Sequence, residues 1–253
     1  MPLDIGQLLA CCQAQLQLEL GLESRALLIP EQSGEYVTGT LHIDGDNISC
    51  ADLMIKPSPK SGSKNKVHTG FRGFSNCWKL IQLTDVSNQL KQLMDRFNLL
   101  LHRQNLHKLP PYYLAILLSD IIHSLHSCQD IFETPKRPDL RDIHSKQMIF
   151  KPTLPEEILL NIFLSSFHLI VTVFYLSTSQ HRYHLQNTKP IVSLCQQESL
   201  INVVLDGSGG KEYEVIYQGE GSCQVPTLKC MLTTISTALK YCQVLHNKIE
   251  CFL

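Results

Sequence analysis

Three side chains in one short run could bind a metal ion. His123, His126 and Cys128 lie within one short stretch of the chain. Residues three apart share one face of a helix, so the two imidazoles could contact the same ion in a metal-dependent enzyme. A closed site needs further ligands that this spacing does not supply, and histidines at the surface or bonded within the protein are the simpler explanation. His181 and His184 form a second pair of this kind.

The familiar catalytic and phosphate-binding motifs are missing from the sequence. A phosphate-binding loop ending in Gly210-Lys211 would need glycine at position 205 and serine or threonine at position 212, which hold Leu205 and Glu212. There is no Gly-x-Ser-x-Gly and no His-Glu-x-x-His sequence. Because catalytic triads assemble in space, missing motifs argue against an enzyme without excluding one. We expect a non-catalytic chain that needs no cofactor.

The charges of the chain are balanced, with 22 Lys and Arg against 23 Asp and Glu and a formal net charge of -1. Such a balance gives no long-range field to attract nucleic acid or an anionic membrane. Lys56, Lys60, Lys64 and Lys66 gather in a loop rich in proline, serine and glycine. This loop is the candidate partner-contact site, although a loop that is simply solvated explains the lysines as well.

The ten cysteines are scattered along the chain, and no two form a Cys-x-x-Cys motif. Several lie in apolar stretches, which is typical of buried thiols in a reducing compartment rather than of disulfides or a metal site. The first residues, Met-Pro-Leu-Asp-Ile, lack the basic and apolar regions of a secretory signal. We therefore expect a soluble, cytoplasmic protein.

The stretch 158–176 carries no charge and has nearly the length of a membrane span. Asn161, Ser165, His168 and Thr172 recur in it at steps of four, three and four. This spacing places them on one stripe of an α-helix, and a histidine would be unfavourable in lipid. The pattern predicts a mostly buried helix of a water-soluble bundle, with an integral membrane segment as the alternative.

Three further segments have helical periodicity. Apolar residues recur at steps of four and three over 86–100, and a second amphipathic segment follows over 114–125. The clearest pattern is a four-three heptad repeat formed by Leu228, Leu232, Ile235, Leu239, Cys242, His246 and Ile249. Its wide apolar stripe suits several partner helices within one bundle, and pairing between two chains stays open. Residues 8–28 mix helical and strand spacing, and we assign them to a helix.

Strands are expected in two separate regions. Residues 36–55 alternate as a hairpin around the turn residues 44–47, and residues 78–83 form another strand. Residues 200–205 and 212–217 form a second pair around a glycine-rich turn. Isolated hairpins are not stable, so the two regions should meet in one small antiparallel domain.

Together these elements predict an α+β protein, in which an antiparallel, leucine-zipper-like bundle of four or more helices carries a small, discontinuous antiparallel β-domain. The bundle would comprise residues 1–33, 84–182 and 226–253. The β-domain would comprise residues 34–83 and 183–225. Residues 134–155 would form an irregular connector within the bundle, because four prolines interrupt them.

Several stretches of the sequence resemble the Rogdi family, over about Gly39 to the end of the chain. Each stretch alone is short, but their order and spacing together are specific. The similar stretches are Gly39–Asp46, Ala51–Leu53, Trp78–Leu80, Phe150–Pro155, Ile158–Asn161 and Val244–Phe252. The resemblance implies a helical part of leucine-zipper type together with a β-domain, as the periodicity does.

The same resemblance implies a function. It predicts a non-catalytic scaffold or adaptor subunit of the complex that assembles the vacuolar-type proton pump. In that complex a Rogdi-like subunit binds a Dmx-like (rabconnectin) WD-repeat protein and helps to rejoin the cytosolic and membrane sectors of the pump. The implied location is the cytoplasm, at the surface of acidic organelles or synaptic vesicles, with a nuclear or perinuclear pool as a further expectation. Nucleic-acid binding and membrane insertion are not expected.

Overall fold

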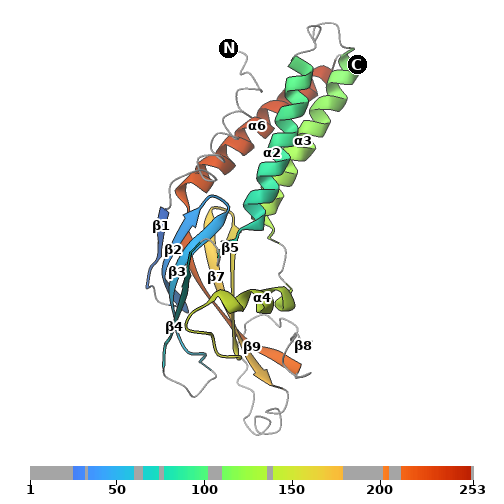
Figure 1. Ribbon diagram of the computed structural model, residues 1–253. Coiled ribbons are helices and arrows are strands. Elements are labelled where there is room, and N and C mark those ends of the chain that lie inside the picture. Colours follow the sequence, from blue (N-terminus) through green and yellow to red (C-terminus); the bar gives the residue numbers. More distant parts are fainter. Residues whose placement is uncertain are drawn as a thin grey trace.

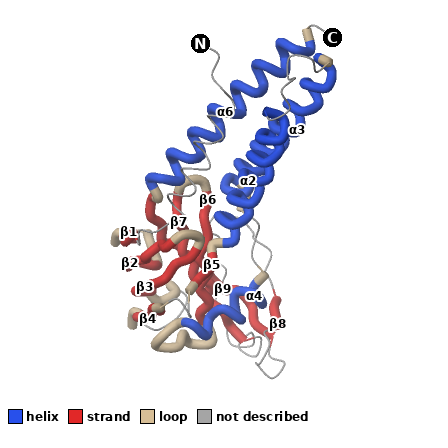
Figure 2. Tube along the Cα trace, turned by 45° about the horizontal axis from the view of Figure 1, so that its top comes forward, coloured by secondary structure: helices blue, strands red, loops and turns tan. Residues whose placement is uncertain are grey.

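The fold consists of a β-sandwich and a three-helix arm that extends from one end of it (Figure 1). Figure 2 shows the same division, with the strands gathered at one end and the long helices at the other. The computed structural model describes residues 25–31, 34–59, 65–73, 77–101, 110–135, 139–178, 202–204 and 212–251.

The first sheet of the sandwich is antiparallel and comes from the N-terminal part of the described chain. Its strands are adjacent in the order β1 (Arg25–Ile29), β2 (Val37–Asp44), β3 (Asn47–Ile55) and β4 (Val67–Arg72). The short β5 (Trp78–Lys79) pairs with the start of β3. The predicted hairpin over 36–55 is therefore confirmed, and Gly45 in its turn has a φ of 64°, which glycine adopts without strain.

Two predictions near this sheet are wrong in their bounds. Residues 25–28, which we assigned to a helix, belong to β1, and the rest of that predicted helix lies outside the described residues. The strand expected over 78–83 ends at Lys79, because α2 begins at Ile81. A single residue therefore separates strand from helix at this point.

The second sheet is also antiparallel, in the order β6 (Ile158–Ser165), β7 (His168–Thr178), β9 (Glu212–Gln224) and β8 (Asn202–Val204). Strands were predicted near both β8 and the start of β9, and β9 is longer than expected. The two predicted β regions contact each other, with β9 against β1 and β2, but they are not strands of one small sheet, since β9 pairs along β7. The two sheets instead pack face to face, and the backbone N–H of Tyr36 donates to the Glu220 carbonyl at 2.8 Å between them.

The helix predicted over 158–176 is wrong, because this stretch is the β6–β7 hairpin. The four polar residues that suggested a helical stripe are cross-strand neighbours: Asn161 pairs with Thr172, and Ser165 pairs with His168. A hairpin that turns at residues 166–167 places these four side chains on one face of the sheet, just as a helix would place them on one stripe. The run is apolar because both faces of the hairpin are covered, and its β-branched and aromatic residues favour strands. Among the described helices, none combines the length and apolar character of a membrane span.

Three long helices form the arm: α2 (Ile81–Leu101), α3 (Pro111–Glu133) and α6 (Pro226–Glu250). These confirm the three helices that were predicted from the periodicity of the sequence. α3 packs against both α2 and α6. The buried seam of α6 follows its heptad pattern and comprises Leu228, Met231, Ile235, Ala238, Leu239 and Cys242. Proline occupies the first turn of both α3 and α6, where its missing N–H costs nothing.

The predicted irregular connector contains two short helices. α4 (Leu140–Lys146) is capped by Asp139, whose side chain accepts the Arg141 N–H at 2.9 Å, and η3 (Gln147–Ile149) follows it. α4 does not join the arm; it covers the outer face of the second sheet through a small apolar cluster of Leu140, Ile143, Leu159, Leu176 and Tyr213. The predicted fold class of a large helical bundle with a small β-domain is therefore wrong. The described chain is a sheet-rich α+β protein.

One continuous apolar core joins the arm to the sandwich. It runs from residues between the two sheets, such as Leu41 and Val171, through Leu83 on α2 to Ile235 on α6. Only Leu80 lies between β5 and α2, and only Val225 lies between β9 and α6; both are buried. The arm therefore continues directly from two strands and shares their core.

The described cysteines are free, as predicted, but they are not all buried. Cys128, Cys223 and Cys242 are buried, whereas Cys230 and Cys251 are exposed. Burial raises the pKa of the Cys223 thiol and of the Cys242 thiol from 9.0 to about 11. Both buried thiols are therefore neutral at physiological pH.

We expect the free energy of unfolding to decrease as the pH rises from about 9 to about 11. The unfolded chain releases these two protons near pH 9, whereas the folded chain keeps them, so alkali favours unfolding. Urea denaturation under reducing conditions would measure the effect. Cys242→Ala should lessen the pH dependence and exposed Cys230→Ala should not; equal slopes in the two variants would contradict the assignment.

Candidate functional site

The residues proposed as a metal site are not gathered around a common point. Cys128 is buried on α3, and its Sγ lies 3.2 Å from Oε1 of Gln89 on α2. The Nε2 of His126 lies 3.4 Å from the Nε2 of Gln243 on α6. Across the described ranges, no three His, Cys, Asp or Glu side chains are placed to hold an ion. His181 and His184 lie outside these ranges.

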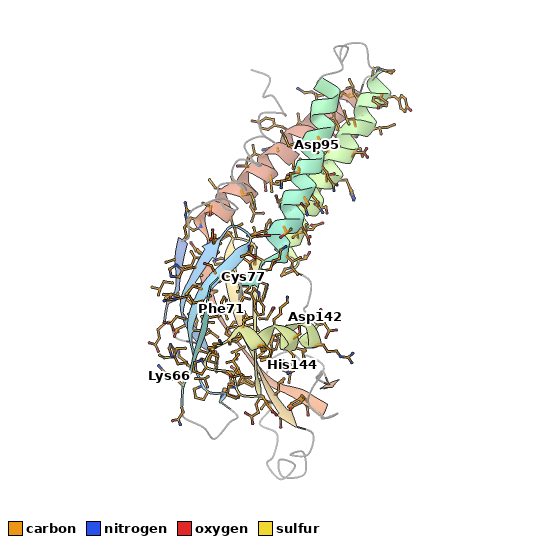
Figure 3. The ribbon with its side chains drawn as sticks, in the orientation of Figure 1. Lys66, Phe71, Cys77, Asp95, Asp142 and His144 are labelled. Carbon is orange, nitrogen blue, oxygen red and sulfur yellow. The ribbon has the colours of Figure 1, made fainter. Side chains whose placement is uncertain are left out.

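The lysines proposed as a partner contact belong to the loop between β3 and β4. Lys66 lies at the end of the sandwich away from the arm (Figure 3), and its Nζ is 3.4 Å from Oε1 of Glu31. The carbonyl of Lys56 accepts a hydrogen bond from the Tyr175 hydroxyl. Lys60 and Lys64 lie outside the described residues. Partner binding by this loop stays a prediction.

The open edge of the second sheet is closed by side chains rather than by another strand. The Gln147 amide accepts the Leu160 N–H at 3.0 Å and donates to the Leu160 carbonyl at 2.8 Å. Gln82 makes the same pair of bonds with Leu164, at 2.8 Å and 2.7 Å. Between them, the Trp78 indole N–H donates to the Ile162 carbonyl at 2.8 Å. These three side chains take the place of a neighbouring strand along β6, which otherwise would expose pairing groups.

The same side chains fix the arm to the sandwich. Gln82 lies in the first turn of α2 and also donates to the Ile131 carbonyl on α3 at 3.1 Å. Asp46, in the β2–β3 turn, accepts the Thr84 hydroxyl at 2.5 Å, and its carbonyl accepts the Leu80 N–H at 2.8 Å. The start of α2 is thus bonded to both sheets and to α3.

A cleft of about 780 Å³ lies at this junction, between the start of α2, the end of α3, α4 and the edge of β6. Its volume falls within the range of about 300–1,000 Å³ that is usual for ligand sites. The apolar residues Trp78, Ile81 and Phe163 belong to its lining, and so do carboxylates from three helices. This is the candidate functional site of the described chain.

The sequence matches the family described as Rogdi leucine zipper containing protein over residues 3–200. The chain belongs to the Rogdi family. Among its relatives, the protein rogdi homolog of Rattus norvegicus is 27% identical over 221 residues, which are 86% of this chain and 73% of the relative. The Danio rerio homolog is 25% identical over 238 residues, 93% of this chain and 80% of the relative. The Homo sapiens homolog is 26% identical over 221 residues, with coverage of 86% and 73%.

The Rogdi match includes every element that forms the junction cleft. It covers the first sheet, α2, α3, α4 and the β6–β7 hairpin. Among the residues that line the cleft, the sequence singled out Asn161 in its polar stripe, and the resembling stretches Trp78–Leu80 and Ile158–Asn161 include four of them. Gln82, Gln147 and the cleft carboxylates carry no local motif, since their roles depend on elements far apart in the chain.

Proposed function

We propose that this chain is a non-catalytic adaptor subunit that promotes assembly of the vacuolar-type proton pump. It would act through contacts with a Dmx-like (rabconnectin) WD-repeat protein and with pump subunits, in the cytoplasm beside acidic organelles. Membership of the Rogdi family is the observation that carries this proposal. The adaptor role requires rigid elements and exposed contact surface rather than a catalytic site.

Exposed apolar side chains on the arm support a role in protein contacts. The start of α3 exposes Tyr112, Tyr113 and Ile116, which are 59%, 41% and 48% accessible. Tyr241, Val244 and Leu245 are exposed towards the end of α6. Large apolar and aromatic side chains are enriched in the cores of protein interfaces. The arm therefore offers the contact surface that an adaptor needs.

Affinity purification of the tagged chain from cell lysate under gentle salt tests this proposal. We expect recovery of a Dmx-like protein and of proton-pump subunits. The Tyr112→Ala/Tyr113→Ala variant should recover less of them, because it removes exposed aromatic surface while changing stability by only about 0.5 kcal/mol per site.

Leu28→Ala/Met148→Ala is the matched control, since both side chains are exposed on the sandwich rather than on the arm. The control should recover the same partners as the unaltered chain. Absence of both the Dmx-like protein and the pump subunits from the unaltered sample would reject the adaptor role in this complex.

A further inference from the structure

The junction cleft carries an excess of negative charge. Asp85 on α2, Asp130 on α3, and Asp139 and Asp142 at α4 all line it; Figure 3 labels Asp142. None of these four carboxylates forms an ion pair with a residue that the structure describes. Asp139 is occupied as the cap of α4, which leaves three carboxylates from three different helices facing one space.

The two lysines that line the cleft make their recorded contacts elsewhere and form no salt bridge with these carboxylates. The Lys79 Nζ lies 3.8 Å from Oδ2 of Asp46, outside the cleft lining. The Lys146 Nζ lies over the Trp78 ring, 5.3 Å from its centroid, as a cation–π contact. Among the described residues, the lining therefore holds four carboxylates against two lysines, which favours a further positively charged group.

A second observation points to a ligand in the same space. Asn161 on β6 lines the cleft and is only 7% exposed. Its side-chain amide forms no hydrogen bond with another described residue and is not among the fully buried, unpaired polar atoms, so the amide is open to the cleft. An amide both donates and accepts, which matches the paired N–H and C=O of a peptide backbone.

Apolar surface beside these polar groups completes the site. Ile81 is 54% exposed at the cleft, and Phe163 is partly exposed. A small inorganic cation would leave this surface uncovered, whereas a peptide with both basic and apolar side chains would cover it. The observations therefore favour a peptide ligand.

We infer that the junction cleft docks a basic segment of a partner protein, with its arginine or lysine side chains held by Asp85, Asp130 and Asp142 and its backbone bonded by Asn161. The inference rests on the proposed function only in that the chain acts through protein contacts. The ligand is defined here by its chemistry: basic side chains, interspersed apolar ones and an accessible backbone.

Purified chain and synthetic peptides test the inference directly. The probe is a short fluorescent peptide in which arginines alternate with leucines, and the matched peptide has glutamate in place of each arginine. Fluorescence anisotropy should show saturable binding of the arginine peptide that weakens as salt rises, because screening reduces exposed charge pairing. The glutamate peptide should not bind.

Two variants separate the roles of charge and backbone bonding. Asp85→Asn/Asp130→Asn/Asp142→Asn should weaken binding about tenfold and reduce its salt dependence. Asn161→Ala should weaken binding but leave the salt dependence unchanged, because it removes no charge. Circular dichroism on each variant confirms that the fold is kept.

The matched control is Asp95→Asn/Asp120→Asn/Glu157→Gln, which removes the same charge from residues outside the cleft lining. Absence of saturable binding up to about 1 mM arginine peptide, or equal weakening by the control, would overturn the inference. Binding that appears only in a Lys136→Ala/Arg137→Ala variant would also overturn it, since the cleft would then serve the chain's own connector. If the affinity purification recovers no pump subunits while the arginine peptide still binds, only the adaptor role is rejected.

Discussion

Replacing Trp78 by alanine should lower the free energy of unfolding by about 3–5 kcal/mol. The side chain is 2% exposed in the core, where its ring centroid lies 6.3 Å from that of Phe150. Its indole N–H also holds the Ile162 carbonyl at the open edge of β6. The alanine variant thus leaves a cavity and an unsatisfied carbonyl at the point where α2 meets both sheets.

A phenylalanine variant separates these two contributions. Trp78→Phe keeps most of the apolar contact but loses the indole donor, so its expected loss is about 1–3 kcal/mol, which is smaller than that of the alanine variant. Since Trp78 is the single tryptophan, unfolding must be followed by circular dichroism rather than by tryptophan fluorescence. Ile81→Ala, at a 54% exposed position nearby, is the control with a small expected change. A loss below about 1 kcal/mol for Trp78→Ala would show that the junction does not depend on this side chain.

Gly221→Ala should destabilise the sandwich by about 3 kcal/mol or more. A Cβ at this position of β9 would lie 2.1 Å from the backbone carbonyl oxygen of Val37 and 3.1 Å from Cγ2 of Ile29. The Val37 contact is with backbone, so a side-chain rotation cannot relieve it. The two sheets would have to move apart at this point, and both Val37 and Ile29 would lose buried contact.

Gly73→Ala is the comparison for this variant. Gly73 has a φ of 107° and no atom within 4 Å of an added Cβ, so alanine there costs only backbone strain, about 1–2 kcal/mol. Thermal and urea denaturation of both variants measure the difference. If Gly221→Ala were as stable as Gly73→Ala, the close approach of the two sheets at β9 would be incorrect.

The helices of the arm and the first hairpin could be predicted because each depends on local periodicity. The heptad of α6 and the turn at Gly45 are decided by residues close together in sequence. The stretch 158–176 could not be assigned by the same reasoning. Its polar spacing is satisfied equally by one helix and by a hairpin folded at residues 166–167, and only its β-branched and aromatic composition favours the strands.

The candidate site was not predictable from the sequence for a different reason. Asp85, Asp130 and Asp142 belong to three helices, and single acidic residues on helices are ordinary surface features. Only the return of α3 towards the sandwich and the docking of α4 on the second sheet bring them together. Lys66, from the lysine loop that the sequence does single out, lies at the end of the sandwich away from the arm.

The one-residue linkers at Leu80 and Val225 have a mechanical consequence. Both are buried, and each passes from strand to helix without a flexible turn, so neither of these two connections gives the arm a hinge. α6 alone, with 25 residues, extends about 38 Å. Proteins attached to the far end of the helices and to the sheets would thus be kept at a set separation, as by a rigid spacer, and a displacement of one would be transmitted to the other.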